Sequence, residues 1–137
     1  LMFPAVDAGI LCAAVADFTP ETMADEKIKR KGDDMVIRLK PTQDIAASLG
    51  QMKTEAQILV GFALETNVEK NNAQLKLKKK NLDFIVLNSL NDEGAGFRCD
   101  TNKITIISVD DEKDFPLKSK AEVAKDIVDE LENHIKA

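Results

Sequence analysis

Uninterrupted apolar runs, separated by segments with helical spacing, constrain the fold of this chain more than any other feature. The runs are Ile10–Ala16, Ile58–Ala63 and the FIVL of Asp83–Asn88. An apolar run without alternation is typical of a strand that is covered on both faces, as in a parallel sheet. The sequence therefore predicts buried strands over these three segments, and shorter strands over Met35–Leu39 and Lys103–Val109.

Helices are expected between these strands and after the last one. Residues 44–52 carry apolar side chains at helical spacing. Thr66 and Glu69 form a capping box that predicts a helix from Asn67 to about Lys80. Ser119 is expected to cap the last helix, because a serine hydroxyl can accept from the first free N–H groups. The apolar stripe of that helix consists of Val123, Ile127, Leu131 and Ile135. Strands alternating with helices predict an α/β fold with a mainly parallel sheet flanked by helices.

Length and charge exclude several classes of protein. A chain of 137 residues is long enough for one domain with a core. The net charge of −5 argues against general nucleic-acid binding, which needs a basic face. No apolar run approaches the ~20 residues of a membrane span, and no charged-then-apolar leader is visible. Cys12 is interpreted as a small core residue and Cys99 as a loop residue, so a reducing cytoplasm is the expected setting.

Polar or aromatic residues follow the predicted strands where ligands bind in open α/β sheets, outside the carboxyl ends of the strands. Asp17 follows the first apolar run, 62–65 lies at the end of the second strand, and Asn88 ends the third. The stretch from Asp17 to Asp34 has no periodicity and is expected to be a long loop, a length that is usually functional or disordered.

Lysines gather at the end of the expected helix 67–80. Lys76 and Lys80 are four residues apart, so they share a helical face and could bind one anion together, while Val68 and Leu75 are expected to pack on the sheet. The alternative is a solvated face that complements the helix dipole, and residue pattern alone favours it. A Ser–His or Cys–His nucleophile system is not expected, because the only histidine, His134, lies in the last turn of the final helix.

Five ordered motifs carry a resemblance to a known family. They are AAVADF (13–18), EKIKR (26–30), QDIA (43–46), GFALET (61–66) and the K-x-x-x-KNLD of 76–83, and F-x-x-D-x-N-K-I-T-I-I (97–107) is also similar. Together they resemble bacterial phosphopantothenoylcysteine synthetase, often the C-terminal half of a bifunctional coenzyme A biosynthesis protein. The resemblance implies a Rossmann-like fold, usually a homodimer, that activates the carboxylate of phosphopantothenate with CTP and Mg²⁺. The acyl-cytidylate then reacts with the amine of cysteine.

The resemblance also assigns roles to residues. Asp17 is implied to lie beside the nucleotide and its metal cation, and Lys27 to reach the reacting phosphate from a mobile flap as the catalytic lysine. The remaining implied nucleotide-binding residues are Gln43, Asp44, Ile45, Ala46, Phe62, Lys76 and Lys80. Gln43 stands where the family usually has proline, and Asn88 is followed by Ser89 where the family often has aspartate.

The N-terminal portion of the family, with its glycine-rich start, is not found in this sequence. Residues 1–137 are therefore expected to be a single domain, the C-terminal part of a synthetase domain. Two alternatives stay open beside the ligase. One is a non-catalytic nucleotide-binding module, and the other is an acidic α/β interaction domain that binds no nucleotide.

Overall fold

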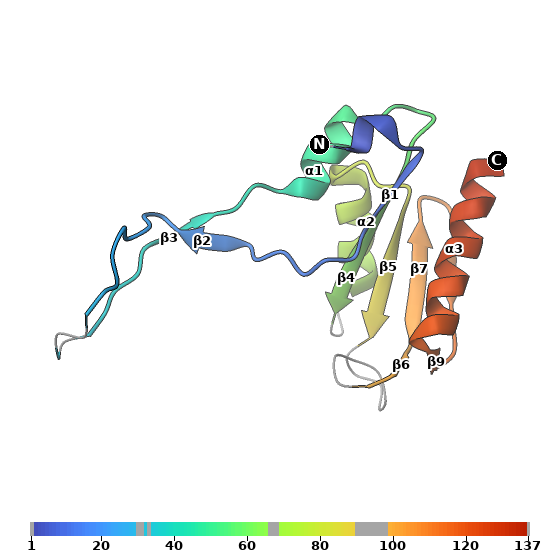
Figure 1. Ribbon diagram of the computed structural model, residues 1–137. Helices are drawn as coiled ribbons and strands as arrows, with labels where there is room; N and C mark the ends of the chain where they lie inside the picture. The colour runs from blue at the N-terminus through green and yellow to red at the C-terminus, as the bar shows by residue number, and fades with distance from the viewer. Residues whose placement is uncertain (1, 30–31, 33, 66–68, 90–98, 137) are drawn as a thin grey trace.

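A five-stranded sheet with the order β1-β4-β5-β7-β8 forms the centre of the molecule, as seen in a computed structural model (Figure 1). The structure describes all residues except 1, 30–31, 33, 66–68, 90–98 and 137. The strands of this sheet are β1 (Ala8–Leu11), β4 (Ile58–Glu65), β5 (Phe84–Ser89), β7 (Ile104–Ser108) and β8 (Glu112–Asp114).

Most strands of the sheet run in one direction. β1 pairs with β4 and β4 with β5 in parallel, whereas β7 is antiparallel to both β5 and β8. β8 therefore runs with β1, β4 and β5, and β7 alone is reversed. The expectation of a mainly parallel α/β sheet is confirmed.

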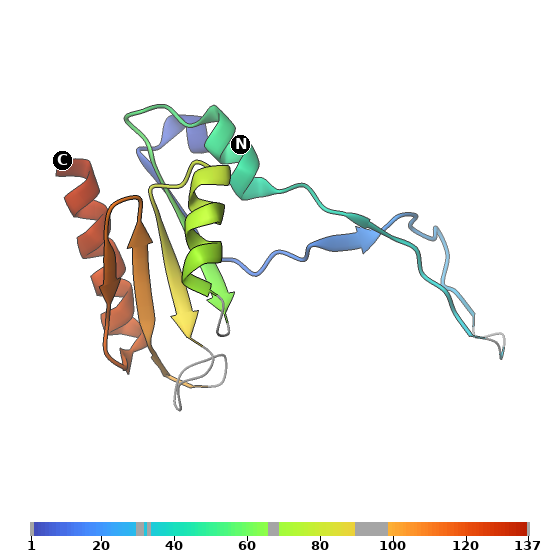
Figure 2. The ribbon, with the colours of Figure 1, turned by 180° about the vertical axis from the view of Figure 1, so that it is seen from behind.

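Helices cover both faces of this sheet. α1 (Ile45–Met52) and α2 (Glu69–Lys79) lie on one face, and α3 (Lys120–Lys136) lies on the other, as the front and back views show (Figures 1 and 2). A short 3-10 helix, η1 (Phe3–Ala5), precedes β1, and β6 (Thr101–Asn102) pairs with β9 (Lys118–Ser119). Among the described residues, no helix combines the length and apolar character of a membrane span.

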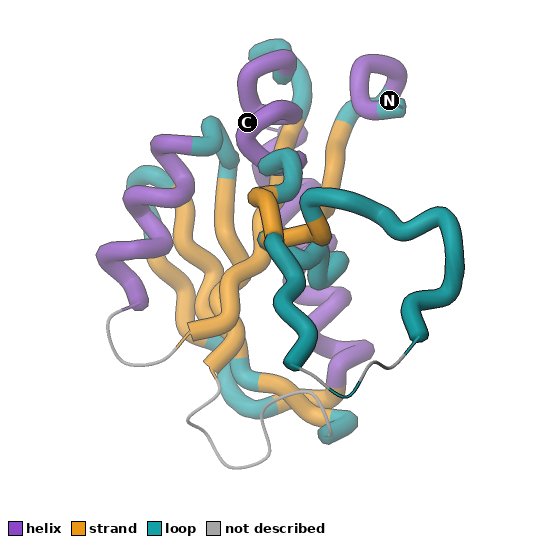
Figure 3. Tube along the Cα trace, turned by 90° about the vertical axis from the view of Figure 1, so that its left-hand side faces the viewer, coloured by secondary structure: helices purple, strands orange, loops and turns teal. Residues whose placement is uncertain are grey.

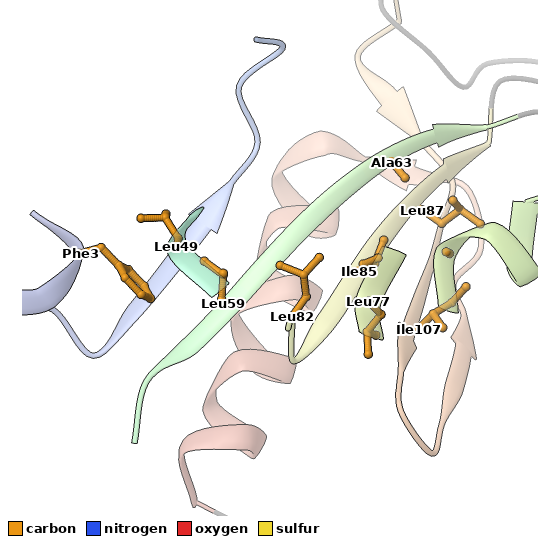
Figure 4. Close-up of a cluster of buried hydrophobic side chains, with 10 residues drawn as sticks. Phe3, Leu49, Leu59, Ala63, Leu77, Leu82, Ile85, Leu87 and Ile107 are labelled. Atoms are coloured by element: carbon orange, nitrogen blue, oxygen red, sulfur yellow. The ribbon is translucent and has the colours of Figure 1, made fainter. Parts of the chain in front are cut away.

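Alternate residues of the central strands fill two hydrophobic clusters, one on each face. On the α1–α2 face, Leu59 and Ile85 pack with Leu49 of α1 and Leu77 of α2 (Figure 4). On the α3 face, Val60 and Phe84 pack with Val123 and Ile127. Because both faces of β4 and β5 are buried, these strands need apolar residues at every position, which explains their uninterrupted runs.

A two-stranded arm projects from the sheet between β1 and α1 (Figures 1 and 3). β2 (Phe18–Pro20) and β3 (Leu39–Pro41) pair antiparallel, with Phe18 opposite Pro41 and Pro20 opposite Leu39. Proline has no N–H to donate, so each end of the ladder lacks one donor. The stretch 17–34, expected to be a loop, therefore contributes a strand to this arm.

Two strand predictions are wrong in extent. The first strand was expected to be buried and to continue to Ala16, but β1 is only partly buried and ends at Leu11, and residues 12–16 are exposed. The alanines of this run bury little area and favour strands weakly. The strand expected over 35–39 is found instead at Leu39–Pro41, where each residue has a partner in the short strand β2. The strands expected over 58–63, 83–88 and 103–109 are confirmed as β4, β5 and β7.

The helix predictions hold with two corrections in packing. Asp44 caps α1, and the Ser119 hydroxyl accepts from the Glu122 N–H at 3.3 Å at the start of α3. The sheet-facing residues of α2 are Ala73 and Leu77, whereas Leu75 is exposed, so packing through Leu75 is wrong. Ile135 leaves the predicted stripe of α3 and is also exposed. Thr66 and Val68 lie outside the described residues.

α1 and the end of α2 approach each other closely at Gly50. A Cβ built on Gly50 would lie 1.8 Å from the Lys80 carbonyl oxygen, a distance that no side chain can occupy. Asn81 follows with a φ of 51°, and its side-chain amide donates to the Gly50 carbonyl at 2.9 Å. The absence of a side chain at position 50 therefore allows the two helices to touch through their backbones.

Gly50→Ala is expected to lower the free energy of unfolding by about 2 kcal/mol or more, because the new methyl group meets backbone rather than a flexible side chain. Helix propensity alone predicts the opposite, a gain of about 1 kcal/mol from replacing glycine inside a helix. Urea unfolding of both proteins decides between the two. A variant as stable as the original, or more so, would contradict the close contact.

Candidate functional site

A pocket of about 770 Å³ opens where β1 ends and β4 continues. Leu11, the last residue of β1, pairs with Gly61, so β4 runs four residues further than its neighbour, from Phe62 to Glu65. The volume lies in the range of small-molecule sites, and the place is the carboxyl end of parallel strands. The walls come from β1 and the segment after it, the base of the arm, the first turn of α1 and the end of α2.

The structure brings eight of the nine residues proposed from the sequence to this pocket. These are Asp17, Gln43, Asp44, Ile45, Ala46, Phe62, Lys76 and Lys80. Lys27 is not among the lining residues; it is exposed on the arm, which projects away from the sheet (Figure 1). Residues from four separate segments thus line one pocket. Lys27, which the resemblance implies to be the catalytic lysine, is not among them.

Asp17 reaches the pocket because the two segments that form the arm are hydrogen-bonded to each other at its base. The Thr42 N–H donates to the Asp17 carbonyl at 2.9 Å, and the Thr42 hydroxyl donates to the Ala16 carbonyl at 2.6 Å. These bonds hold Asp17 beside the segment that leads into α1. The expectation that Asp17 directly ends a buried strand is wrong, because β1 ends at Leu11.

Asp44 performs two tasks at the start of α1. Its side chain accepts from the Ala47 N–H at 3.0 Å and so caps the helix. Its second oxygen lies 3.1 Å from the Lys80 ammonium. The hydrogen bond from Ala47, together with the nearby Lys80, lowers the pKa of the Asp44 carboxyl below its usual value. Asp44 is therefore ionised at neutral pH.

Lys76 and Lys80 line the pocket from the last turns of α2. Helical spacing puts Lys76 and Lys80 beside Ala73 and Leu77, at the border of the face that is buried against the sheet. Lys78 is exposed and is not among the lining residues, as its rotation from Lys80 by about 160° requires. The helical spacing in the sequence therefore places both lysines on one wall.

Phe62 and Gly61 face opposite sides of β4. The Phe62 side chain packs against the cluster on the α3 face, so it borders the pocket from the far side of the strand. A Cβ on Gly61 would lie 2.7 Å from Leu82, on the α1–α2 side. Gly61 therefore leaves the inner wall of the pocket without a side chain between β4 and Leu82.

The described residues contain no group of three or more histidine, cysteine or acidic side chains that could hold a metal ion by themselves. Magnesium is commonly bound by one or two carboxylates together with substrate phosphates. Asp17 is exposed and lines the pocket, so it could supply one such carboxylate.

The pocket includes residues that sequence reasoning missed. Cys12 is exposed and lines the pocket, so its interpretation as a core residue is wrong. The cause is the early end of β1, which leaves residue 12 outside the sheet. Thr42 and Phe18 also line the pocket. Phe18 pairs with Pro41, and Thr42 donates to the Ala16 and Asp17 carbonyls; these are long-range contacts that periodicity does not reveal.

Comparison with known proteins places this arrangement in a family. Residues 2–135 match the family described as "DNA/pantothenate metabolism flavoprotein C-terminal domain". The chain is 47% identical over 131 residues to the coenzyme A biosynthesis bifunctional protein CoaBC of Bacillus subtilis (strain 168), which covers 95% of this chain and 32% of that protein. It is 61% identical over 127 residues to a protein named cysteine/cysteine sulfinic acid decarboxylase from an unknown prokaryotic organism, covering 92% of this chain and 35% of that one.

A solved structure shares the fold. The crystal structure of the C-terminal domain of CoaBC superposes with a TM-score of 0.77 at 35% identity, over 98% of this chain and 60% of that one. The Rossmann-like fold is thereby confirmed. The chain spans about a third of the length of the curated relatives that it matches. The chain belongs to the family of DNA/pantothenate metabolism flavoprotein C-terminal domains.

Proposed function

We propose that this chain is the nucleotide-binding part of a ligase that joins phosphopantothenate to cysteine in coenzyme A biosynthesis, with CTP as the activating nucleotide. One observation carries the proposal: eight residues, chosen from sequence motifs alone, line one pocket in a member of this family. The 47% identity to a coenzyme A biosynthesis protein supports the same reaction. We place it in the cytoplasm, where coenzyme A precursors are made.

The proposed chemistry needs no protein nucleophile. A carboxylate oxygen of phosphopantothenate attacks the α-phosphorus of CTP, and pyrophosphate leaves. The amine of cysteine then attacks the acyl carbon of the acyl-cytidylate, and CMP leaves as the amide forms. The protein contributes position and positive charge where negative charge develops. Lys76 and Lys80 bind the nucleotide, and Lys27 stabilises the reacting phosphate after the arm closes.

Asp17 is proposed to hold Mg²⁺ together with the triphosphate. The ion would neutralise phosphate charge and so allow a triphosphate to lie beside a carboxylate. Gln43, Ile45 and Ala46 form the wall at the start of α1, where Gln43 is held by a bond from its amide to the Ser48 hydroxyl at 3.1 Å.

A non-catalytic nucleotide-binding module remains the second candidate. The observation in its favour is that Lys27 does not line the pocket. This candidate predicts CTP binding without turnover even when the rest of the synthetase domain is present. The decarboxylase relative does not carry the proposal, because the residues that line the pocket are those that the ligase resemblance assigns.

A second copy of this chain is proposed to cover the arm. Met23 is 92% exposed and Val36 is 87% exposed, and both lie on the arm beyond the β2–β3 ladder. Exposed apolar side chains that gather on one projecting element usually mark an interface. A homodimer would bury them and would fix the arm in one direction.

Replacing Met23 and Val36 by lysine is expected to convert a dimer into a monomer, since charges would enter the proposed interface. Sedimentation velocity measures the change. Val109→Lys is the control, because Val109 is 58% exposed on the body of the protein, after β7. A dimer that survives the arm substitutions would place the interface elsewhere.

Lys76→Ala or Lys80→Ala is expected to weaken CTP binding by about 1–3 kcal/mol, the range for a charge-assisted hydrogen bond. Calorimetric titration of CTP measures the loss. Lys78→Ala provides the matched control, because it removes the same charge from the exposed side of the same helix. Equal, small effects at all three positions would mean that the lysines act only as nonspecific charge.

Lys27→Gln is expected to lower turnover by about 10²-fold or more while CTP still binds, as for one lost transition-state donor. The assay needs this chain joined to the rest of the synthetase domain, because the chain covers 60% of the solved CoaBC C-terminal domain. Lys29→Gln is the control on the same arm. Turnover near that of the unmodified enzyme would remove Lys27 from the mechanism.

A further inference from the structure

The segment after β1, residues 12–17, lies outside the sheet but lines part of the pocket. Residues 12–16 of this segment are exposed. The Val15 N–H donates to the Ala13 carbonyl at 3.0 Å, a bond that stays within the segment. A local bond of this kind does not fix where Asp17 lies relative to the other walls of the pocket.

Thr42 holds this segment from the other side of the base of the arm. Its hydroxyl donates to the Ala16 carbonyl at 2.6 Å, and its N–H donates to the Asp17 carbonyl at 2.9 Å. Two bonds from one residue to consecutive carbonyls restrain both the position and the rotation of the backbone there. Thr42 is half-buried and precedes Asp44, the cap of α1, by two residues. The start of α1 is therefore the fixed point against which the Asp17 backbone is held.

The side chain of threonine suits this junction. Its hydroxyl supplies the donor that the bond to Ala16 requires. Its β-branching restricts χ1, so the hydroxyl loses little rotational freedom when the bond forms. The bond between Thr42 and Ala16 is exposed, so water can reach the Ala16 carbonyl if the hydroxyl is removed. Loss of the hydroxyl is therefore expected to loosen the junction without unfolding the protein.

We propose that Thr42 is a positioning residue, whose hydroxyl holds the Asp17 carboxylate in place for a metal-bound nucleotide. This inference rests on the proposed function, which assigns Asp17 to Mg²⁺ and the triphosphate. A binding segment that is correctly placed only part of the time binds with an affinity reduced by that fraction. One hydrogen bond shifts such an equilibrium by about 5-fold, which is the size of the expected effect. Thr42 acts through Asp17 and takes no part in the reaction itself.

The first test is calorimetric titration of CTP, with Mg²⁺, into the 137-residue chain and three variants. Thr42→Val removes the hydroxyl but keeps the shape of the side chain and the N–H bond to Asp17. Thr42→Ser restores the hydroxyl. Thr19→Val makes the same exchange in β2, opposite Lys40, and is the matched control. Thr42→Val is expected to weaken binding about 5-fold, whereas the other two variants bind as the unmodified chain does.

A double-mutant cycle separates positioning of Asp17 from a general structural effect. In the Asp17→Asn background no carboxylate remains for Thr42 to position, so Thr42→Val is expected to have little further effect on CTP binding. An equal loss of affinity in both backgrounds would overturn the proposal. A Thr42→Val chain that binds CTP as tightly as the unmodified chain would overturn it as well.

Hydrogen exchange at residue 42 gives a readout that needs no nucleotide. The Thr42 N–H donates to the Asp17 carbonyl, so its protection factor measures how often the junction opens. In the ligand-free chain this factor is expected to be about 5-fold lower for Thr42→Val than for Thr42→Ser. Equal protection in the two variants would contradict a role of the hydroxyl. If the unmodified chain binds no CTP, the proposed function fails, and hydrogen exchange alone decides whether the hydroxyl holds the junction.

Discussion

The backbone contact between α1 and the end of α2 determines the chemistry of the pocket. Gly50 lets the Lys80 carbonyl approach to a distance that any side chain would prevent, and Asn81 adds a hydrogen bond to the Gly50 carbonyl. Because the Lys80 backbone lies against α1, its side chain can extend along that helix to the cap residue Asp44. One glycine in the middle of a helix thus sets which charges face a ligand several residues away.

The unequal ends of β1 and β4 provide the space that these charges surround. In parallel strands of equal length, side chains and loops would close the edge of the sheet. Here β1 ends at Leu11 beside Gly61, and the chain turns out into the arm instead of continuing beside β4. The Thr42 bonds to Ala16 and Asp17 then close the pocket from the side of the arm. The arm and the pocket are consequences of the same early strand end.

The sequence predicted best where burial acts on both faces of an element. β4 and β5 begin with uninterrupted non-polar runs over Ile58–Leu64 and Phe84–Leu87, so their existence and approximate limits followed from the residues themselves. The pocket residues at the start of α1 followed from the family resemblance, and helical spacing added only that Lys76 and Lys80 share a face. Ile10–Ala16 looked equally apolar, but only Ala8–Leu11 has a strand partner, and no local pattern shows where a partner ends.

Long-range pairing explains the remaining failures. The arm forms because β2 pairs with β3, although a long stretch rich in charged residues separates them in the sequence. Three paired residues in each strand are too few to give a periodic signal in the sequence. The exposure of Cys12 follows from the early end of β1, and the position of Lys27 outside the pocket follows from the arm that β2 and β3 form. The sequence motifs suggested which side chains act together, but the course of the backbone determines which of them line the pocket.

The balance of charge in the pocket connects the arm to the proposed reaction. Asp17, Asp44, Lys76 and Lys80 contribute two negative and two positive side chains to its walls. A nucleoside triphosphate adds several negative charges, which the two lysines of these walls neutralise only in part. Mg²⁺ at Asp17 would supply part of the missing positive charge. The remaining positive charge would come from the basic residues of the arm, which include Lys27 and Lys29. Binding of the triphosphate would therefore favour closure of the arm.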